Sequence, residues 1–336
     1  CCGHHAQMAG IFGAALALTV PEIAEKLGGQ VVFFATPAEE YGEIEFKNQL
    51  REQGKIRYGG GKCELIRTGA FDDIDLCLAH HIRPGDEIQV GSGTGNGFVS
   101  KVIRYLGKAA HAAGAPDKGV NALSAASLGL QALGLNRETF RDEDCVRVHP
   151  IITKGGNLVN VIPDEIVIET LVRAKTIEAF TDAAKKTDRS FQAGAVAMGA
   201  KVEITTLPGY LPTLAEQALP ELKRAAELAA PEVPVREAAG HSGGSTDVGD
   251  VQHLMPVYTF NTGGVKGGLH QINFEVTNEE EAYIDTAKMF ALAAYGLLKE
   301  KAARSKELVK NYKPVFKDSA EYTKFMEQFD SKEVLD

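Results

Sequence analysis

The sequence contains no tryptophan, few cysteines and no run of about 18 or more apolar residues. Without such a run, no segment is expected to span a bilayer. The five cysteines are Cys1, Cys2, Cys63, Cys77 and Cys145. An odd number without regular spacing is typical of free thiols in a reducing compartment, so we expect a cytoplasmic protein.

Basic residues are fewer than acidic residues. The sequence has 36 lysines and arginines against 45 aspartates and glutamates, which gives a formal net charge of −9. This balance argues against nucleic acid or an anionic membrane as the main partner. The net charge does not exclude a small anionic substrate, because a local arginine or metal ion overrides the global field at one site.

A chain of 336 residues is long for one compact core, which favours two domains. Apolar residues between positions 8 and 16 recur at helical spacing and predict a helix with one buried stripe. The apolar runs at 31–35 and 74–82 predict strands that are covered on both faces. Helix and buried strand in alternation indicate an α/β domain with a mostly parallel sheet.

The pattern changes near residue 97. Residues 97–208 read as strand, helix, strand, strand, helix and strand, which is the order of a ferredoxin-like α+β unit. We therefore expect this unit to be inserted into the first domain, which comprises residues 1–96 and 209–336. Residues 300–336 are charged and have no strong apolar stripe, so we expect a solvated helical tail.

Side chains suited to metal binding occur where predicted strands end or helices begin. Cys2 and His4 are one residue apart at a helix entrance, and Glu39 and Glu40 follow an apolar strand. Each signal is weak alone, since buried cysteine and histidine are often structural and acidic residues are common at helix N-termini. Adjacent side chains point apart, so one glutamate can bind metal while the other acts as a base.

Two histidines extend this set. His81 lies at the end of the second apolar run, and His270 follows two glycines and a leucine after the predicted strand near Phe260. Cysteine, histidine and glutamate together suit a divalent transition metal. Five candidate ligands and a spare carboxylate exceed the needs of one tetrahedral ion, which favours two ions about 4 Å apart.

Several stretches that contain these residues follow one another through nearly the whole chain. They are Cys2-Gly3-His4, Pro37-Ala38-Glu39-Glu40, GAFDDID at 69–75 leading to His81, GKAAHAA at 107–113, NVIPD at 160–164, STDVGDV at 245–251, and Leu269-His270. In this order they resemble the metallopeptidase M20 family. Within that family the sequence is similar to the amidohydrolase branch, which includes aminobenzoyl-glutamate hydrolases and N-acyl amino acid hydrolases.

The resemblance implies a fold and a set of roles. The fold would be a zinc-peptidase-like catalytic domain with an inserted lid and dimerisation domain, and the protein would be a homodimer. The implied metal ligands, for two Zn²⁺ or Mn²⁺ ions, are Cys2, His4, Glu40, His81 and His270. Glu39 would be the general base, and His111 would reach the active site of a partner subunit to stabilise the oxyanion. Asn160 and Arg173 would contact the substrate carboxylate or the oxyanion.

The implied activity is hydrolysis of the amide bond in an N-acyl amino acid such as aminobenzoyl-glutamate. A dipeptidase or aminopeptidase of the same family, or a binding protein that has lost activity, are the alternatives. Two departures from the family stand out. His5 replaces the usual Asp or Asn and could compete as a ligand, and the motif at the very start leads us to expect further residues upstream of Cys1.

Overall fold

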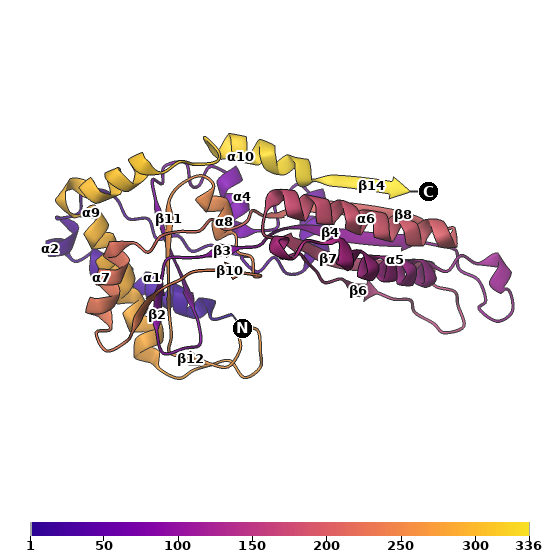
Figure 1. Ribbon diagram of the computed structural model, residues 1–336, viewed down its shortest axis with the longest axis horizontal. Coiled ribbons are helices and arrows are strands. Elements are labelled where there is room, and N and C mark those ends of the chain that lie inside the picture. The colour runs from indigo at the N-terminus through magenta and orange to yellow at the C-terminus, as the bar shows by residue number, and fades with distance from the viewer. Residues whose placement is uncertain (1, 336) are drawn as a thin grey trace.

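The computed structural model describes residues 2–335; Cys1 of the opening motif and Asp336 lie outside the described residues. The elements form two groups, each built around a sheet of its own (Figure 1). The helices of the two groups are α1 (His4–Leu18), α7 (Pro220–Ala229) and α9 (Thr286–Asn311) in one, and α5 (Ala122–Asn136) and α6 (Ile177–Met198) in the other. Within the described residues no helix is long and apolar enough to cross a membrane.

The sheet of the first group has the strand order β1-β11-β2-β9. Its strands are β1 (Cys77–Ile82), β11 (Val257–Thr262), β2 (Ile88–Val90) and β9 (Val235–Glu237). Strand β1 pairs with β11, and β2 with β9, in parallel, whereas β11 and β2 are antiparallel. The predicted α/β fold with a mostly parallel sheet is confirmed.

Short elements connect and flank this sheet. The helices are α2 (Pro21–Ala24), α3 (Ile44–Glu52), α4 (Gly61–Arg67), α8 (Val248–Gln252) and the π-helical turn η4 (Glu280–Asp285). The strands are β3 (Thr94–Gly95), β10 (His241–Ser242), β12 (Val265–Lys266) and β13 (Glu275–Val276). Strand β10 pairs with β3, and this pairing anchors the segment that precedes residues 245–247.

Helix α1 forms as predicted, but it buries a different face. Met8, Phe12 and Leu16 are exposed, whereas the buried positions include Gly10 and Ala14. A side chain at Gly10 would collide with Thr286 of α9, so the small residues are what allow the two helices to approach closely. The prediction of a buried stripe through the large apolar residues is therefore wrong.

Residues 31–35, predicted as a buried strand, form no strand and pair with none in the described structure. Phe34 stacks on Phe71 with 4.7 Å between ring centroids, while Val32 and Phe33 are exposed. A strand requires backbone hydrogen bonds to a neighbouring strand, and among the described residues this segment forms none. It leads instead, as irregular chain, to Glu39 and Glu40.

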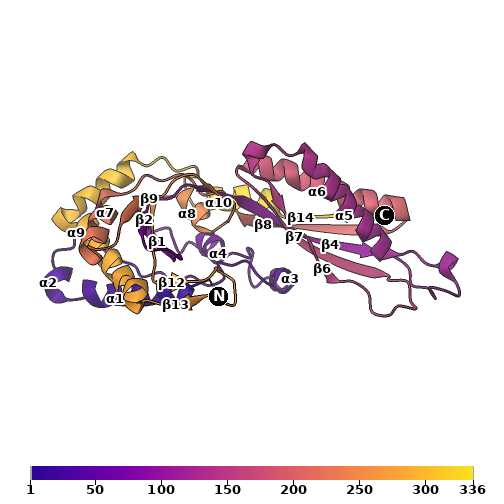
Figure 2. The ribbon, with the colours of Figure 1, turned by 60° about the horizontal axis from the view of Figure 1, so that its bottom comes forward.

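The second group contains the antiparallel sheet β14-β8-β4-β7-β5, with β6 paired to β7. Its strands are β4 (Gly97–Leu106), β5 (Arg147–Val148), β6 (Ile151–Lys154), β7 (Glu165–Ala174), β8 (Lys201–Tyr210) and β14 (Ser331–Leu335). Strands β4 to β8 with α5 and α6 have the predicted ferredoxin-like order, and both helices cover one face of the sheet (Figure 2). Asn121 and Thr176 cap these helices.

The C-terminal segment is not the solvated tail that the sequence suggested. Helix α10 (Ser319–Met326) buries Tyr322 and Met326 completely, and β14 then pairs with β8 at the edge of the second sheet. Pairing with a strand more than a hundred residues away leaves no local signal in the sequence, which explains the error. Because β14 joins this sheet, the bounds 97–208 for the inserted domain stay a prediction.

Replacing Tyr322 with alanine tests whether this segment is part of the core. The side chain is fully buried, packs near Tyr58 and Phe316, and donates a hydrogen bond to Asp250 Oδ1 at 2.8 Å. We expect Tyr322→Ala to lower the free energy of unfolding by about 3–5 kcal/mol in urea denaturation. The exposed Val315→Ala is the control and should change it by less than about 0.5 kcal/mol. If both substitutions lowered the free energy of unfolding equally, the C-terminal segment would be a solvated tail and not part of the core.

Candidate metal centre

The first two candidate ligands are positioned by a turn at the start of α1. Gly3 has φ 82°, and a side chain there would collide with Ile82 at the end of β1. Only glycine adopts this conformation freely, so it allows Cys2 and His4 to lie against β1 while the helix begins at His4. The triplet is thus a turn that brings a thiol and an imidazole to one edge of the sheet.

The alternation of strand β1 separates two adjacent histidines. His80 is buried among Phe260 and Phe290, and its Nε2 contacts Thr262 Oγ1 at 2.8 Å. His81 faces the opposite way, with its Nδ1 donating to the carbonyl of Ile82 at 2.7 Å. This hydrogen bond leaves the lone pair of His81 Nε2 free, and that atom lies 3.5 Å from Cys2 Sγ.

Glu39 and Glu40 lie in a loop that is tied to the second sheet. Tyr210 at the end of β8 donates to the carbonyl of Glu39 at 2.5 Å, and Tyr41 donates to the carbonyl of Pro208 at 2.6 Å. Tyr41 is buried and adopts φ 52°, a conformation that packing must enforce in a residue with a side chain. The position of the two carboxylates therefore depends on the junction with the second domain.

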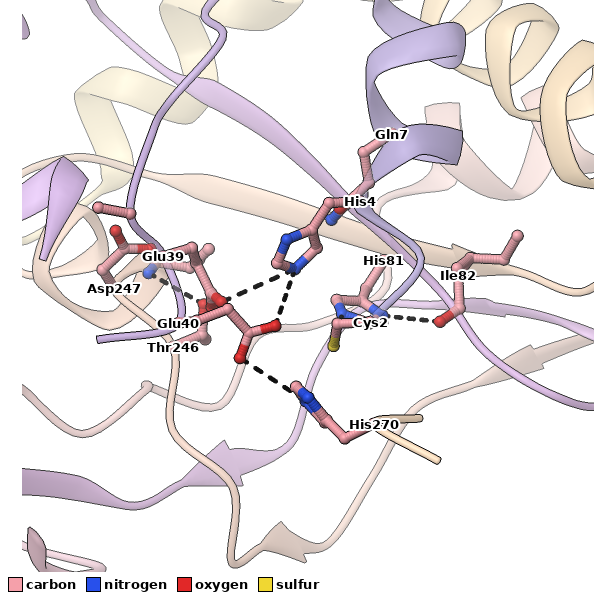
Figure 3. Close-up of polar contacts among 12 residues, drawn as sticks. Cys2, His4, Gln7, Glu39, Glu40, His81, Ile82, Thr246, Asp247 and His270 are labelled. Carbon is pink, nitrogen blue, oxygen red and sulfur yellow. Dashed lines mark hydrogen bonds and ion pairs between the residues drawn. The ribbon is translucent and has the colours of Figure 1, made fainter. Parts of the chain in front are cut away.

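The last candidate ligand comes from the loop between β12 and β13. His270 adopts φ 62°, and its imidazole is more than half exposed. Its Nε2 lies 3.6 Å from Glu40 Oε2. The loop thus places His270 across Glu40 from His4 (Figure 3).

The predicted ligands converge on a common space (Figure 3). Their donor atoms form three overlapping groups within 4.8 Å of one another: Cys2, His4 and His81; Cys2, Glu40 and His270; and His4, Glu39 and Glu40. The distances from His4 Nε2 to Glu39 Oε2 and Glu40 Oε1 are 3.8 and 3.9 Å. Donor atoms around a tetrahedral ion with bonds of about 2.0–2.3 Å lie about 3.3–3.8 Å apart, so these residues fit divalent cations.

The titration behaviour of the cluster also favours a cation. Burial, together with the charges of Glu40 and Glu39, raises the pKa of the Cys2 thiol to about 12. Burial raises the pKa of Glu39 and lowers that of His81, which keeps this imidazole neutral at pH 7. A divalent ion reverses the penalty on the acidic groups, since a coordinating thiol is deprotonated outright.

Ser245, Thr246 and Asp247, which begin the 245–251 motif, also lie next to the cluster, although the sequence predicted no role for them. Thr246 donates a hydrogen bond to Glu39, which opposes the effect of burial on its pKa. Fully buried Asp247 accepts from the backbone N–H of Lys62 at 2.9 Å and from its Nζ at 2.5 Å. Ser245 accepts from Arg173 Nη1 at 3.0 Å. Only the fold reveals these contacts, because the partners are far apart in the sequence.

Arg173 is the substrate-binding candidate that the structure places near the cluster. It lies 5.4 Å from the ring of Phe98, and burial lowers its pKa, opposed by the nearby Tyr210 and Glu39. His111 and Asn160 lie on exposed loops of the second domain, where Ala112 N–H donates to the Asn160 carbonyl. Neither contacts the cluster within the described chain, so their roles stay predictions.

The possible competitor, His5, points elsewhere. Its ring lies against Phe274 and Tyr283, with centroid distances of 6.3 and 5.9 Å. It belongs to none of the ligand groups found among the described residues. Consecutive residues on a helix are rotated by about 100°, so His4 and His5 cannot both face the same ion.

The fold and the cluster define a two-domain protein with a candidate centre for paired divalent ions. The chain belongs to peptidase family M20/M25/M40, whose sequence profile matches residues 1–295. It is 28% identical to the Xaa-Arg dipeptidase of Mus musculus, over 93% of this chain and 67% of that protein. It is 29% identical to one of the subunits of the p-aminobenzoyl-glutamate hydrolase of Escherichia coli K12, over 52% of this chain and 32% of that protein.

Among solved structures, the chain is similar to a dinuclear metal binding peptidase of the M20 family from Bacillus subtilis. The TM-score is 0.56 at 23% identity, and the match covers 88% of this chain and 72% of the other. At this identity the likeness shows the shared fold. Together with the family profile, it confirms the predicted family and its architecture.

The adjacent histidines provide a matched test of the ligand set. We expect His4→Ala to lower the amount of Zn²⁺ or Mn²⁺ retained per chain by roughly tenfold or more after equilibrium dialysis, because one donor atom is lost. His5→Ala should retain metal like the unmodified protein. Elemental analysis of both variants measures this. Metal loss in His5→Ala with full retention in His4→Ala would contradict the assignment.

Proposed function

We propose that this chain forms the catalytic centre of a metal-dependent amidohydrolase that cleaves N-acyl amino acids such as aminobenzoyl-glutamate. The single observation that carries the proposal is Glu39, a largely buried carboxylate that lies 3.8 Å from His4 Nε2 and is held by Thr246. A general base in a water-activating centre requires this placement, next to the ions yet anchored by a group of its own.

Cys2, His4, Glu40, His81 and His270 would hold two ions. Cysteine and histidine favour Zn²⁺, whereas glutamate also suits Mn²⁺. When bound, the ions would lower the pKa of a water molecule and polarise the amide carbonyl. Glu39 accepts the proton of the attacking water and then delivers it to the leaving nitrogen. Arg173, beside Ser245 and Glu39, binds the carboxylate of the amino acid.

A homodimer formed through the second domain completes the proposed site. The open edge at β6 and the loop that follows carry exposed apolar side chains, which supports an interface there; they are Ile151, Ile152, Leu158 and Val159. The Nδ1 of His111 accepts hydrogen bonds from the N–H groups of Ala113 and Gly114. Its Nε2 therefore carries the proton, and it can donate to the oxyanion in a neighbouring subunit.

A dipeptidase is the second candidate, because the mouse Xaa-Arg dipeptidase matches 93% of the chain. Hydrolysis of substrates with a blocked amine favours the amidohydrolase, whereas a requirement for a free amine favours the dipeptidase. The described cysteines, Cys2, Cys63, Cys77 and Cys145, are free thiols, which fits the reducing cytoplasm as the proposed location.

Glu39→Gln tests the proposed base. The amide keeps the shape of the side chain but cannot take up the proton, so we expect kcat to fall by roughly 10²–10⁴-fold while bound metal is unchanged. Glu43→Gln in the same loop, with an exposed side chain, is the control. Turnover of aminobenzoyl-glutamate and metal content are measured on the same preparations. Undiminished turnover in Glu39→Gln would remove this residue from the role.

Mixing two inactive variants tests the contribution of His111 across the interface. In a mixture of His111→Ala and Glu39→Gln chains, half of the randomly formed dimers are mixed, and each mixed dimer has one site with both groups intact. We therefore expect activity to return to about one quarter of that of the unmodified protein. Each variant incubated alone is the control. No recovery in a mixture shown to exchange subunits would place His111 outside the partner's site.

A further inference from the structure

A cavity of about 430 Å³ lies between strands β5 and β7 of the second sheet and the loop that follows β10. Its lining is Arg147, His149, Leu171, Arg173 and Gly243. This volume is typical of a site for a small molecule. Arg173 belongs to the site proposed above, whereas Arg147 and His149 have no role so far.

The strand register explains why the cavity is basic. Arg147 of β5 lies directly opposite Arg173 of β7, and their neighbours Val148 and Val172 are buried on the other face, towards the helices. Two like charges placed opposite each other on paired strands destabilise a sheet. Neither guanidinium has a carboxylate within ion-pair distance in the described part of the chain, so the repulsion between them is reduced only by solvent at the exposed Arg147 and by the more distant Glu39 and Tyr210 at Arg173. An anionic ligand between them would compensate it.

The same row of side chains leads to the catalytic residues. From Arg147 it crosses to Arg173, then to Phe98 of β4 and Tyr210 of β8, which are register partners on successive strands. Arg173 lies over Phe98, Phe98 packs on Tyr210 at 4.7 Å, and Tyr210 donates to the carbonyl of Glu39. Along this row, Arg147 therefore lies one strand farther from Glu39 than Arg173 does.

We propose that Arg147 and His149, beside Arg173, form a subsite for a second carboxylate, so that the amino acid released is aspartate or glutamate. This inference rests on the proposed amidohydrolase function and narrows its substrate class. Facing residues on antiparallel strands are about 5 Å apart, a span that the two or three carbons between the carboxylates of these amino acids can cover. Two neighbouring guanidinium groups disfavour a cationic side chain such as that of arginine.

Three substrates with the same acyl group separate the possibilities: aminobenzoyl-glutamate, aminobenzoyl-glutamine and aminobenzoyl-arginine. We expect the unmodified protein to have the highest kcat/KM for the glutamate compound and the lowest for the arginine compound. Arg147→Gln should reduce the preference for glutamate over glutamine by roughly 10- to 100-fold, mainly through KM, since a charge-assisted hydrogen bond is lost. Arg147→Lys should restore part of the preference.

Arg141→Gln is the matched control, because Arg141 is exposed, pairs with Glu143 and lies outside the cavity. It should keep the preference of the unmodified protein. Equal losses on glutamate and glutamine substrates in Arg147→Gln, or no preference for glutamate in the unmodified protein, would overturn the subsite alone. Failure to cleave any of the three compounds would instead overturn the proposed function.

A binding measurement decides the subsite even in that last case. Calorimetric titration of N-acetylglutamate and N-acetylglutamine into the 336-residue chain compares the two side chains without turnover. Tighter binding of N-acetylglutamate that is lost in Arg147→Gln and kept in Arg141→Gln supports the subsite. Equal affinity for both compounds, or an unchanged difference in Arg147→Gln, contradicts it.

Discussion

Residues 245–247 connect the parts of this site through three adjacent side chains. Ser245 accepts a hydrogen bond from Arg173, Thr246 donates one to Glu39, and Asp247 forms the buried ion pair with Lys62. The segment thus sets the distance between an arginine of the second domain and the proposed base of the first. A shift of this segment would move the substrate-binding charge and the base together.

The site has two halves of opposite charge, one acidic and one basic. Around Cys2 and Glu40, acidic groups lie close together with no lysine or arginine in an ion pair with them among the described contacts, and a neutral His81 offers a lone pair. On the other side, Arg147 and Arg173 lie opposite each other with no carboxylate of the described residues within ion-pair distance. Like charges that lie close together repel one another, so the first half favours cations and the second half favours an anionic substrate.

The sequence identifies side chains that the fold brings together, because each candidate ligand lies next to a local signal. Gly3 precedes a helix, His81 ends an apolar strand, and His270 follows Gly267 and Gly268. The ferredoxin-like order is also predicted, because its alternating strands and long helices have clear periods. These features depend on residues close together in the chain.

The features that were predicted wrongly or missed depend instead on residues that are far apart in the chain. Residues 31–35 have the composition of a strand but pair with no strand among the described residues, and β14 pairs with a strand that is remote in the sequence. The face that α1 buries depends on how closely α9 approaches Gly10. The opposed pair of Arg147 and Arg173 exists only once the register of β5 and β7 is known. Non-local packing decides each of these features, and local patterns do not encode it.

The central claim is that Cys2, His4, Glu40, His81 and His270 hold paired divalent ions beside Glu39. Anomalous diffraction from crystals grown with Zn²⁺ or Mn²⁺, recorded on both sides of the metal absorption edge, tests it most directly. The account predicts two peaks about 4 Å apart within bonding distance of these donor atoms. Peaks elsewhere on the protein, with none among these five side chains, would contradict it.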